Sequence, residues 1–483
     1  MKSGPYTDSS FAGDQSRPTP WTKPVKLENM MKTKCYKPVK NRFIAILLGI
    51  VLCLPVTVCA KQDTLTRKIY RISLKDAIAL GKDQNTLVKA AISEESATQS
   101  DFKDAKMAAL PSIITNANYQ RFTSLTLYDS FPGGAHSTPK RPGPDAADLS
   151  LSASLNLYSG GRQKALEAEF SEKKELSKIG TQEQTAALGL QVVAEYLGVV
   201  RLADQKRLIR EQVARAEARL KNIRALFINQ KVTRSDLLRA ELVLSSVKLN
   251  LEAADNDIKI SNQKLNVLLN MPDSTLIITT DSANMPRPLP ESLLQLVDNA
   301  SQDAYSVQRS SSNIKIHDAR IRGIKSNYAP SVSLYSAYGI SYPNTIFFPP
   351  VDQAYSIGFI GLKMSYNISS IYQNRNKMAA GQIRLQQLRY LRQNVKDNVN
   401  QEASALLIKY REALNRIFVT EQSIKQASVN YKIVSAKYFN QLALLTDLLD
   451  ADNLYQESRF NLVQAQTSAL FYYYQLLYTS GKL

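Results

Sequence analysis

The stretch ALFINQKVTRSDLLRAE, residues 225–241, is echoed later in the chain by AKYFNQLALLTDLLDAD, residues 436–452. Six identities share one displacement of 211 residues: Asn229, Gln230, Asp236, Leu237, Leu238 and Ala240 recur as Asn440, Gln441, Asp447, Leu448, Leu449 and Ala451. A turn repeated in this way predicts an internal duplication, in which each copy places the same turn between two helices.

Large apolar residues recur every seven positions after each repeated turn. In the first copy they are Leu237, Leu244, Leu251, Ile258 and Leu265, and mostly small residues follow three positions later at Ala240, Val247, Ala254 and Ser261. The second copy keeps this phase from Leu448 to Leu476. A heptad seam of this kind is typical of helices that pack closely as a coiled coil.

Proline separates the chain into tracts that permit long helices. No proline occurs between Pro55 and Pro111, between Pro144 and Pro272, or after Pro350, and proline breaks helix interiors. The resulting predictions are helices over 161–229, 233–270, 374–439 and 443–479. A helix of about 65 residues is a rod of about 100 Å, at 1.5 Å per residue.

Four segments of about ten residues alternate apolar and polar side chains, at 112–123, 148–158, 331–342 and 355–368. In LSLSASLNLY the leucines occupy one face and serines the other. Strands between lipid and water show this pattern. A half-buried soluble sheet would show it too, but two pairs at matching places in a duplicated chain favour the membrane.

Turn-rich segments join the strands of each pair, at 129–148 and 341–354, and are typical of loops outside a barrel. Single-chain membrane barrels start at eight strands, and an open sheet edge in lipid leaves backbone groups unsatisfied. Four strands therefore predict a barrel shared between chains, whose number the periodicity does not determine.

An export signal is expected at residues 30–60. The apolar run FIAILLGIVLCLPVTVCA follows a basic stretch and ends in Val58-Cys59-Ala60, which suits signal peptidase. The alternatives are an uncleaved membrane anchor and a lipidated N-terminus at Cys59. Residues 1–29 are expected to be a disordered extension or a misassigned start, with Met30 or Met31 the more natural beginning.

The composition of the chain argues against an enzyme or a metal-binding protein. The chain has 483 residues, a net charge of +19, two histidines and three cysteines, all of the cysteines within residues 1–60. Catalytic residues, a metal site and a cofactor are therefore not expected. The basic excess is spread along helices of an exported chain, so we do not expect nucleic-acid binding.

Several segments, taken in order, resemble the TolC family of outer-membrane efflux channels: ISLKDAIALGKDQNTLVKAA, AALPSIITNANYQ, LNLYSGGRQKALEAEF and SDLLRAELVLSSVKLNLEAADNDIKISNQKLNVLLNMP. The order recurs in weaker form from about Val307 to Tyr478. The resemblance covers essentially all of residues 70–480. It implies two repeats, 61–290 and 291–483, each a helix-strand-strand-helix-helix unit of an α+β membrane protein.

The resemblance further implies a homotrimer. Three chains would form a twelve-stranded β-barrel in the outer membrane, continuous with a long periplasmic tunnel of α-helical coiled coils. The expected function is a passive exit duct for drugs or other small molecules, with outer-membrane lipid, a periplasmic adaptor and an inner-membrane pump as partners. The alternatives are the exit duct of a type I protein secretion system and an inner-membrane-anchored coiled-coil adaptor or scaffold.

The family's functional positions carry over to three regions of this sequence. The periplasmic tips, where adaptors dock, correspond to Asn229, Gln230, Lys231, Val232, Thr233 and Arg234 and to Asn440, Gln441, Leu442, Ala443 and Leu444. The family commonly has glycine where this chain has Gln230 and Gln441. The strand-to-helix junction corresponds to Gly160 and Gly161, and the second-half equivalent, 371–377, lacks both glycines.

Three acidic residues beside the tips are candidates for a tunnel constriction: Asp236, Asp447 and Asp450. Acidic side chains in the first turn of a helix also complement the helix dipole. That second interpretation is the favoured one.

Overall fold

The computed structural model describes residues 69–123, 126–128, 135–137, 144–346 and 351–483. The chain divides into two compact units, Met1–Thr64 and Leu65–Leu483, and every described residue belongs to the second. The signal peptide expected at 30–60 and the extension expected at 1–29 therefore lie outside the described residues.

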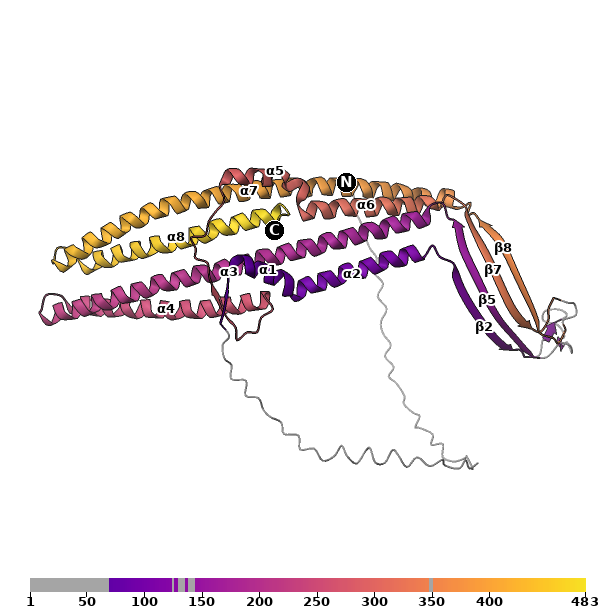
Figure 1. The fold of residues 1–483 in the computed structure, drawn as a ribbon, viewed down its shortest axis with the longest axis horizontal. Coiled ribbons are helices and arrows are strands. Elements are labelled where there is room, and N and C mark those ends of the chain that lie inside the picture. The colour runs from indigo at the N-terminus through magenta and orange to yellow at the C-terminus, as the bar shows by residue number, and fades with distance from the viewer. Residues whose placement is uncertain (1–68, 124–125, 129–134, 138–143, 347–350) are drawn as a thin grey trace, which may run out of the picture. The chain divides into compact units, whose positions relative to one another are not determined.

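Long helices dominate the described part of the chain (Figure 1). In chain order the α-helices are α1 (Leu74–Gln84), α2 (Thr86–Met107), α3 (Arg162–Ile228), α4 (Arg234–Leu268), α5 (Leu294–Asp303), α6 (Tyr305–Ser326), α7 (Ser370–Phe439) and α8 (Leu445–Thr479), with a 3-10 turn at Pro290–Leu293. The long helices occupy the proline-free tracts.

Strands form one larger sheet and two small pairs. They are β1 (Ile69–Ile72), β2 (Ser112–Arg121), β3 (Thr126–Tyr128), β4 (Ala135–Ser137), β5 (Asp145–Tyr158), β6 (Leu276–Thr279), β7 (Ser331–Tyr342) and β8 (Tyr355–Ser365). The larger sheet has the order β2-β5-β7-β8, β1 pairs with β6, and β3 pairs with β4.

The helices pack lengthwise, and the sheet lies beyond the ends of α2, α3, α6 and α7 (Figure 1). The contacts between elements give the order α2-α3-α6-α7 next to the sheet and α4-α3-α8-α7 farther from it. Helices α3 and α4 form one antiparallel hairpin, and α7 and α8 form the second. Helices α2 and α4 therefore lie at one lateral edge of the chain, and α7 lies at the other.

The heptad seam of α4 is turned inward. Its small positions are buried, with exposed fractions of 3% for Ala240, 5% for Val247 and 7% for Ala254. Val247 and Ala254 form one cluster with Ile209 of α3. Small side chains at these positions allow the two backbones to approach, as the heptad pattern indicates.

The larger sheet is antiparallel throughout and remains open in a single chain. Its central pair, β5 and β7, joins the two halves of the duplication, with Leu151 opposite Tyr338. Strands β2 and β8 are the edges. A chain by itself does not form the closed twelve-stranded barrel.

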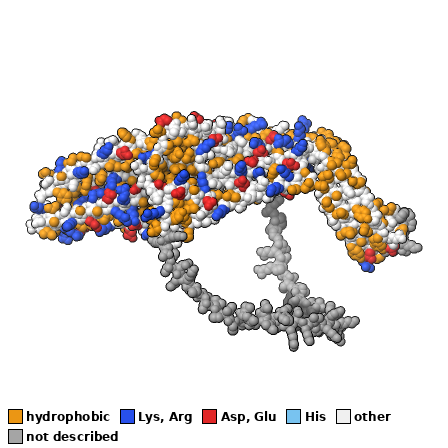
Figure 2. Space-filling view, in the orientation of Figure 1, with side chains coloured by type: hydrophobic (Ala, Val, Ile, Leu, Met, Phe, Trp, Pro, Cys, Tyr) orange, Lys and Arg blue, Asp and Glu red, His pale blue; other side chains and the backbone are white. Residues whose placement is uncertain are grey.

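The two faces of this sheet differ in polarity, since paired residues share a face. One face carries exposed apolar side chains from all four strands, namely Ile113, Tyr119, Leu149, Leu151, Tyr338, Ile340, Ile360, Leu362 and Met364. The other carries Asn116, Asn118, Ser150, Ser152, Ser154, Ser333 and Lys363, with Ile114, Ile357 and Phe359 among them. Hydrophobic side chains dominate the visible surface of the sheet, whereas charges are spread over the helices (Figure 2).

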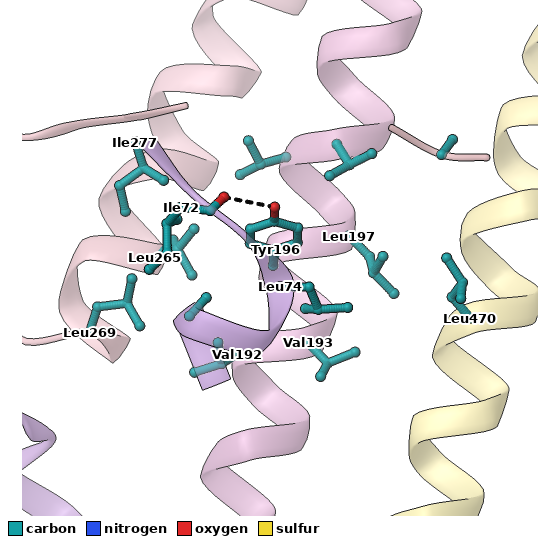
Figure 3. Packing of buried hydrophobic residues seen from close by; sticks show 14 of the residues in the cluster. Ile72, Leu74, Val192, Val193, Tyr196, Leu197, Leu265, Leu269, Ile277 and Leu470 are labelled. Carbon is teal, nitrogen blue, oxygen red and sulfur yellow. Dashed lines mark hydrogen bonds between the residues drawn. The ribbon is translucent and has the colours of Figure 1, made fainter. Parts of the chain in front are cut away.

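The largest apolar core surrounds Tyr196 on α3 (Figure 3). The Tyr196 hydroxyl lies 2.9 Å from the carbonyl oxygen of Ile72 and 2.8 Å from a carboxylate oxygen of Asp281. Burial and the hydrogen bond to Asp281 raise the pKa of Tyr196, so the hydroxyl stays protonated as a donor. This contact holds β1 against α3, next to β6, the strand that pairs with β1 in parallel. The sequence patterns did not predict the pairing of β1 with β6.

Helix α3 is a core helix rather than a separate membrane span. Among the described helices it alone has a window long and apolar enough to cross a membrane, and half of that window is buried inside the fold. Val192 and Val193 of this helix belong to the core in Figure 3, and Val200 belongs to the same cluster. Its apolar content therefore follows from packing within the chain.

Candidate functional site

The two repeated turns lie side by side at the ends of the helical hairpins farthest from the sheet (Figure 1). We call residues 229–234 the first tip and residues 440–444 the second tip. One apolar cluster joins them: Ile223 of α3, Tyr438 of α7 and Leu448 of α8 are buried in it, and Val232 and Ala443 from the tips pack against it. The structure thus brings together segments that lie far apart in the sequence.

Both tips begin with the same helix-ending geometry. Gln230 and Gln441 have φ values of 57° and 60°, in the left-handed region. The amide of Gln230 donates to the carbonyl of Phe227 and the amide of Lys231 donates to that of Leu226, both at 2.9 Å. Gln441 and the residue after it repeat both bonds. This is the Schellman arrangement, in which glycine is the usual left-handed residue, and it accounts for the glycine common in the resembling family.

The asparagine before each glutamine also contributes to the helix end, through its side chain. Asn229 Nδ2 donates to the carbonyl of Ala225 at 2.8 Å, and Asn440 Nδ2 donates to that of Ala436 at 2.9 Å. Each of these carbonyls also accepts from the backbone amide of the same asparagine, at 3.3 Å for Asn229 and 3.1 Å for Asn440, so the side chain adds a second hydrogen bond at the helix end. The repeated Asn-Gln pair therefore closes the helix in the same way at both tips.

The repeated aspartates cap the helices that follow. Asp236 accepts a hydrogen bond from the amide of Thr233 at 3.0 Å, and the amide of Asp236 donates to the Thr233 hydroxyl at 3.2 Å, which completes a capping box. Asp447 accepts from the amide of Leu444 at 3.0 Å. Leu444 has no side-chain hydroxyl to accept from the amide of Asp447, so the second tip has only one of the two hydrogen bonds of a capping box. Asp450 is exposed and forms no ion pair with any residue that the structure describes.

Replacing Gln230 or Gln441 by glycine is expected to stabilise the protein by about 1 kcal/mol, because a β-carbon is unfavourable in the left-handed region. Thermal unfolding of the detergent-solubilised protein measures the change. The matched control is Gln382→Gly, in the exposed interior of α7, where glycine should cost about 1 kcal/mol. Equal losses at all three positions would contradict the interpretation of the tips.

The tips share their backbone geometry but differ in the side chains they expose. The second tip presents Leu442 and Leu444, whose exposed fractions are 75% and 69%. The corresponding part of the first tip presents Lys231, Thr233 and Arg234, all exposed. One tip therefore offers an apolar surface and the other a basic and polar surface.

A buried ionic cluster joins the two hairpins through α3 and α8. Asp452, with an exposed fraction of 3%, accepts a hydrogen bond from Arg215 Nε at 2.9 Å and from Arg219 Nη2 at 2.5 Å. Arg215 Nη2 also donates to Gln456 Oε1 at 3.1 Å. The carboxylate thus has a hydrogen-bonded cation on each oxygen, which a buried charge requires.

Sequence reasoning missed this cluster, although Asp452 is the last residue of the second echoed stretch. A faint signal existed, because Arg215 and Arg219 are four residues apart and so share one face of a helix. Nothing in the sequence paired that face with Asp452, 233 residues beyond Arg219.

The first strand-to-helix junction depends on glycine. Gly160 and Gly161 have φ values of 61° and 84°. A β-carbon on Gly160 would lie 2.6 Å from both the Ala329 β-carbon and the Ser326 carbonyl oxygen, at the end of α6. Glycine therefore supplies both the backbone angle and the space for this contact.

The second junction lies earlier than expected. Residues 371–377, proposed as the equivalent bend, are helical, because α7 already begins at Ser370. The bend between β8 and α7 is confined to residues 366–369, where the Asn367 side chain accepts from the amide of Ser369 at 3.1 Å. This asparagine turn takes the place of the glycines and corrects the predicted position.

Among the described residues there is no group of three or more His, Cys, Asp or Glu side chains placed to hold a metal ion.

A known protein family and several solved structures share features with this chain. Residues 78–271 match the family model described as outer membrane efflux protein. The search of curated proteins returned no match.

Solved structures share the fold. VceC from Vibrio cholerae has 15% sequence identity and a TM-score of 0.69, with 84% of this chain and 96% of that chain covered. The MtrE outer membrane channel of Neisseria gonorrhoeae has 16% identity and a TM-score of 0.67, covering 84% and 88%. The CmeC outer membrane channel of Campylobacter jejuni has 14% identity and a TM-score of 0.67, covering 85% of each chain.

Proposed function

We propose that this chain, whose residues 78–271 match the family model described as outer membrane efflux protein, forms the passive exit duct of a tripartite pump for drugs or other small molecules. Membership of that family would make it a transport protein of the outer membrane rather than an enzyme. The observation that carries the proposal is the sheet with one apolar and one polar face, joined to long helices that end in paired tips.

The open sheet supports a barrel shared among copies. Its apolar face suits lipid and its polar face suits a water-filled lumen. Edges β2 and β8 would leave unpaired amides and carbonyls within the membrane, which is too costly to persist. We propose that β8 of one copy pairs with β2 of the next and that three copies close a twelve-stranded barrel, as the family resemblance implies.

Exposed apolar side chains on the edge helices support the same assembly. On α4, Leu242, Leu249 and Val267 have exposed fractions of 71%, 66% and 67%. On α7, Ile383 and Tyr390 have fractions of 70% and 69%. Stripes of this kind on a helix are expected to be covered by another helix. Copies packed edge to edge would cover both stripes and extend the helical layer into a tunnel.

The two tips are proposed as the docking surface for a periplasmic adaptor. They lie at the end of the helices opposite the sheet, so they would face an adaptor and an inner-membrane pump across the periplasm. Asp450 is proposed as the constriction residue, since Asp236 and Asp447 are engaged in helix capping whereas the Asp450 carboxylate is exposed.

Membrane fractionation and gel migration of unheated samples test the proposed function. The protein should fractionate with the outer membrane, run as an oligomer without heating and as a monomer after heating, and lower drug accumulation in cells. A band confined to the inner membrane would instead indicate an anchored scaffold. An outer-membrane oligomer without effect on small molecules, whose loss stops export of a polypeptide, would identify a protein secretion duct.

Replacing Leu442 by glutamate is expected to reduce efflux severalfold while leaving the amount of oligomer unchanged, because a charge would disrupt an apolar docking contact. Drug accumulation measures efflux, and an unheated gel measures the oligomer. The matched control is Leu289→Glu, which places the same charge at a position 72% exposed outside the tips. Loss of the oligomer in Leu442→Glu alone would make the tip a folding element rather than a docking surface.

A further inference from the structure

The lateral edges of the chain carry unbalanced charge near the sheet. From Ser370 to Lys396, α7 contains six cationic side chains and no acidic one: Arg375, Lys377, Arg384, Arg389, Arg392 and Lys396. None of them forms an ion pair with a residue that the structure describes. By contrast, acidic side chains on α3 are paired with cationic side chains on α6, as in Glu169–Arg320 at 2.9 Å.

Helix α2, at the opposite edge, separates its charges by face. Val88 and Ala105 are buried toward α3. Glu94 and Asp101 are exposed, lie seven residues apart and so share one flank of the helix, whereas Lys89 and Lys103 lie on the other flank. Neither acidic side chain has an ion-pair partner in the described part of the chain.

Two cations on α7 repeat this spacing. Lys377 and Arg384 are exposed and seven residues apart, so they share one flank of the helix. Asn374 and Gly381 are buried, so they mark the face of α7 that packs inside the chain. Lys377 and Arg384 lie three or four residues from these buried positions, so they occupy a flank between the buried face of α7 and the exposed stripe of Ile383 and Tyr390.

The charges also match in distance from the sheet. Four residues separate the end of α2 from β2, and four separate β8 from the start of α7. At 1.5 Å per residue, Asp101 and Glu94 lie about 9 and 20 Å from the sheet end of α2. Lys377 and Arg384 lie about 10 and 21 Å from the sheet end of α7. Helix α2 runs toward the sheet and α7 runs away from it, so edge-to-edge copies would place them antiparallel at equal depth.

We infer that α7 of one copy packs against α2 of the next copy through two ion pairs, Lys377 with Asp101 and Arg384 with Glu94. This inference rests on the proposed assembly and names the contact that sets its register beside the membrane. Flanking positions of antiparallel helices pair in this way, and complementary charges fix register and exclude wrong partners. The second copy supplies the ion-pair partners that these four side chains lack among the described residues of their own chain.

Charge reversal and charge exchange test the pairing. Arg384→Glu should lower the temperature at which the oligomer dissociates on gels by about 5 °C, and Glu94→Lys should do the same. The double variant Arg384→Glu with Glu94→Lys should recover most of the loss. Raising the salt concentration from about 0.05 to 1 M should shrink the differences, because salt screens exposed pairs.

The matched control is Lys103→Glu, which reverses an exposed cation on the other flank of α2, about 6 Å from its sheet end, and should leave the oligomer unchanged. An oligomer in the wild type that Arg384→Glu does not weaken overturns the pairing alone. Weakening that Glu94→Lys fails to recover also overturns it and indicates anionic lipid headgroups as the countercharge. A monomeric wild type overturns both the pairing and the proposed function.

Discussion

Replacing Asp452 by alanine is expected to lower the free energy of unfolding by about 3–5 kcal/mol. The substitution leaves the guanidinium groups of Arg215 and Arg219 between α3 and α8 without their carboxylate, and Arg219 is 5% exposed. An uncompensated buried charge is much more costly than the loss of an exposed pair. Chemical denaturation of the detergent-solubilised protein measures the change.

The control for Asp452→Ala lies two residues earlier. Asp450→Ala removes the same carboxylate from an exposed position and should change stability by less than about 0.5 kcal/mol. Replacing Asp452, Arg215 and Arg219 together by Leu, Met and Met should recover most of the loss, since apolar residues often substitute for buried ion pairs without cost. Comparable stability of Asp452→Ala and Asp450→Ala would show that the cluster contributes little.

Replacing Leu151 by lysine is expected to destabilise the assembled barrel by about 2–4 kcal/mol, the cost of a lysine facing lipid near the midplane of a membrane. Leu151 lies near the middle of β5, on the apolar face of the sheet. The measurement is the yield of heat-modifiable oligomer in the outer membrane, followed by its unfolding in denaturant.

The neighbouring residue gives the matched control for Leu151→Lys. Ser152 lies on the polar face, so Ser152→Lys would place the same charge in the lumen and should reduce the oligomer far less. The reverse order of effects would mean that the faces had been assigned the wrong way round. Equal effects would mean that neither face contacts lipid.

Features with a repeating local pattern could be predicted from the sequence. Long helices followed from the absence of proline, and the strands followed from alternation, because both constraints act along the chain itself. The glycines at 160 and 161 were likewise visible as a requirement of backbone geometry. The family resemblance added the expected order of the elements.

Contacts between distant segments could not be predicted in this way. Strands β1 and β6 have four residues each and pair across more than 200 positions, so neither is long enough to show a period. The burial of Asp452 depends on how α8 packs against α3, and its own sequence neighbours give no sign of it. The second junction was misplaced because an asparagine turn at Asn367 replaced the expected glycines.

The paired tips, which share one turn geometry and differ in exposed side chains, have a consequence for symmetry. In the proposed trimer the backbone of the tips would repeat six times around the axis, whereas their chemistry would repeat only three times. Six identical adaptor molecules could then fit the backbone equally well but would occupy two classes of site, one beside Leu442 and one beside Arg234. Occupancy would proceed in two steps of three molecules, with the first step at whichever tip binds more tightly.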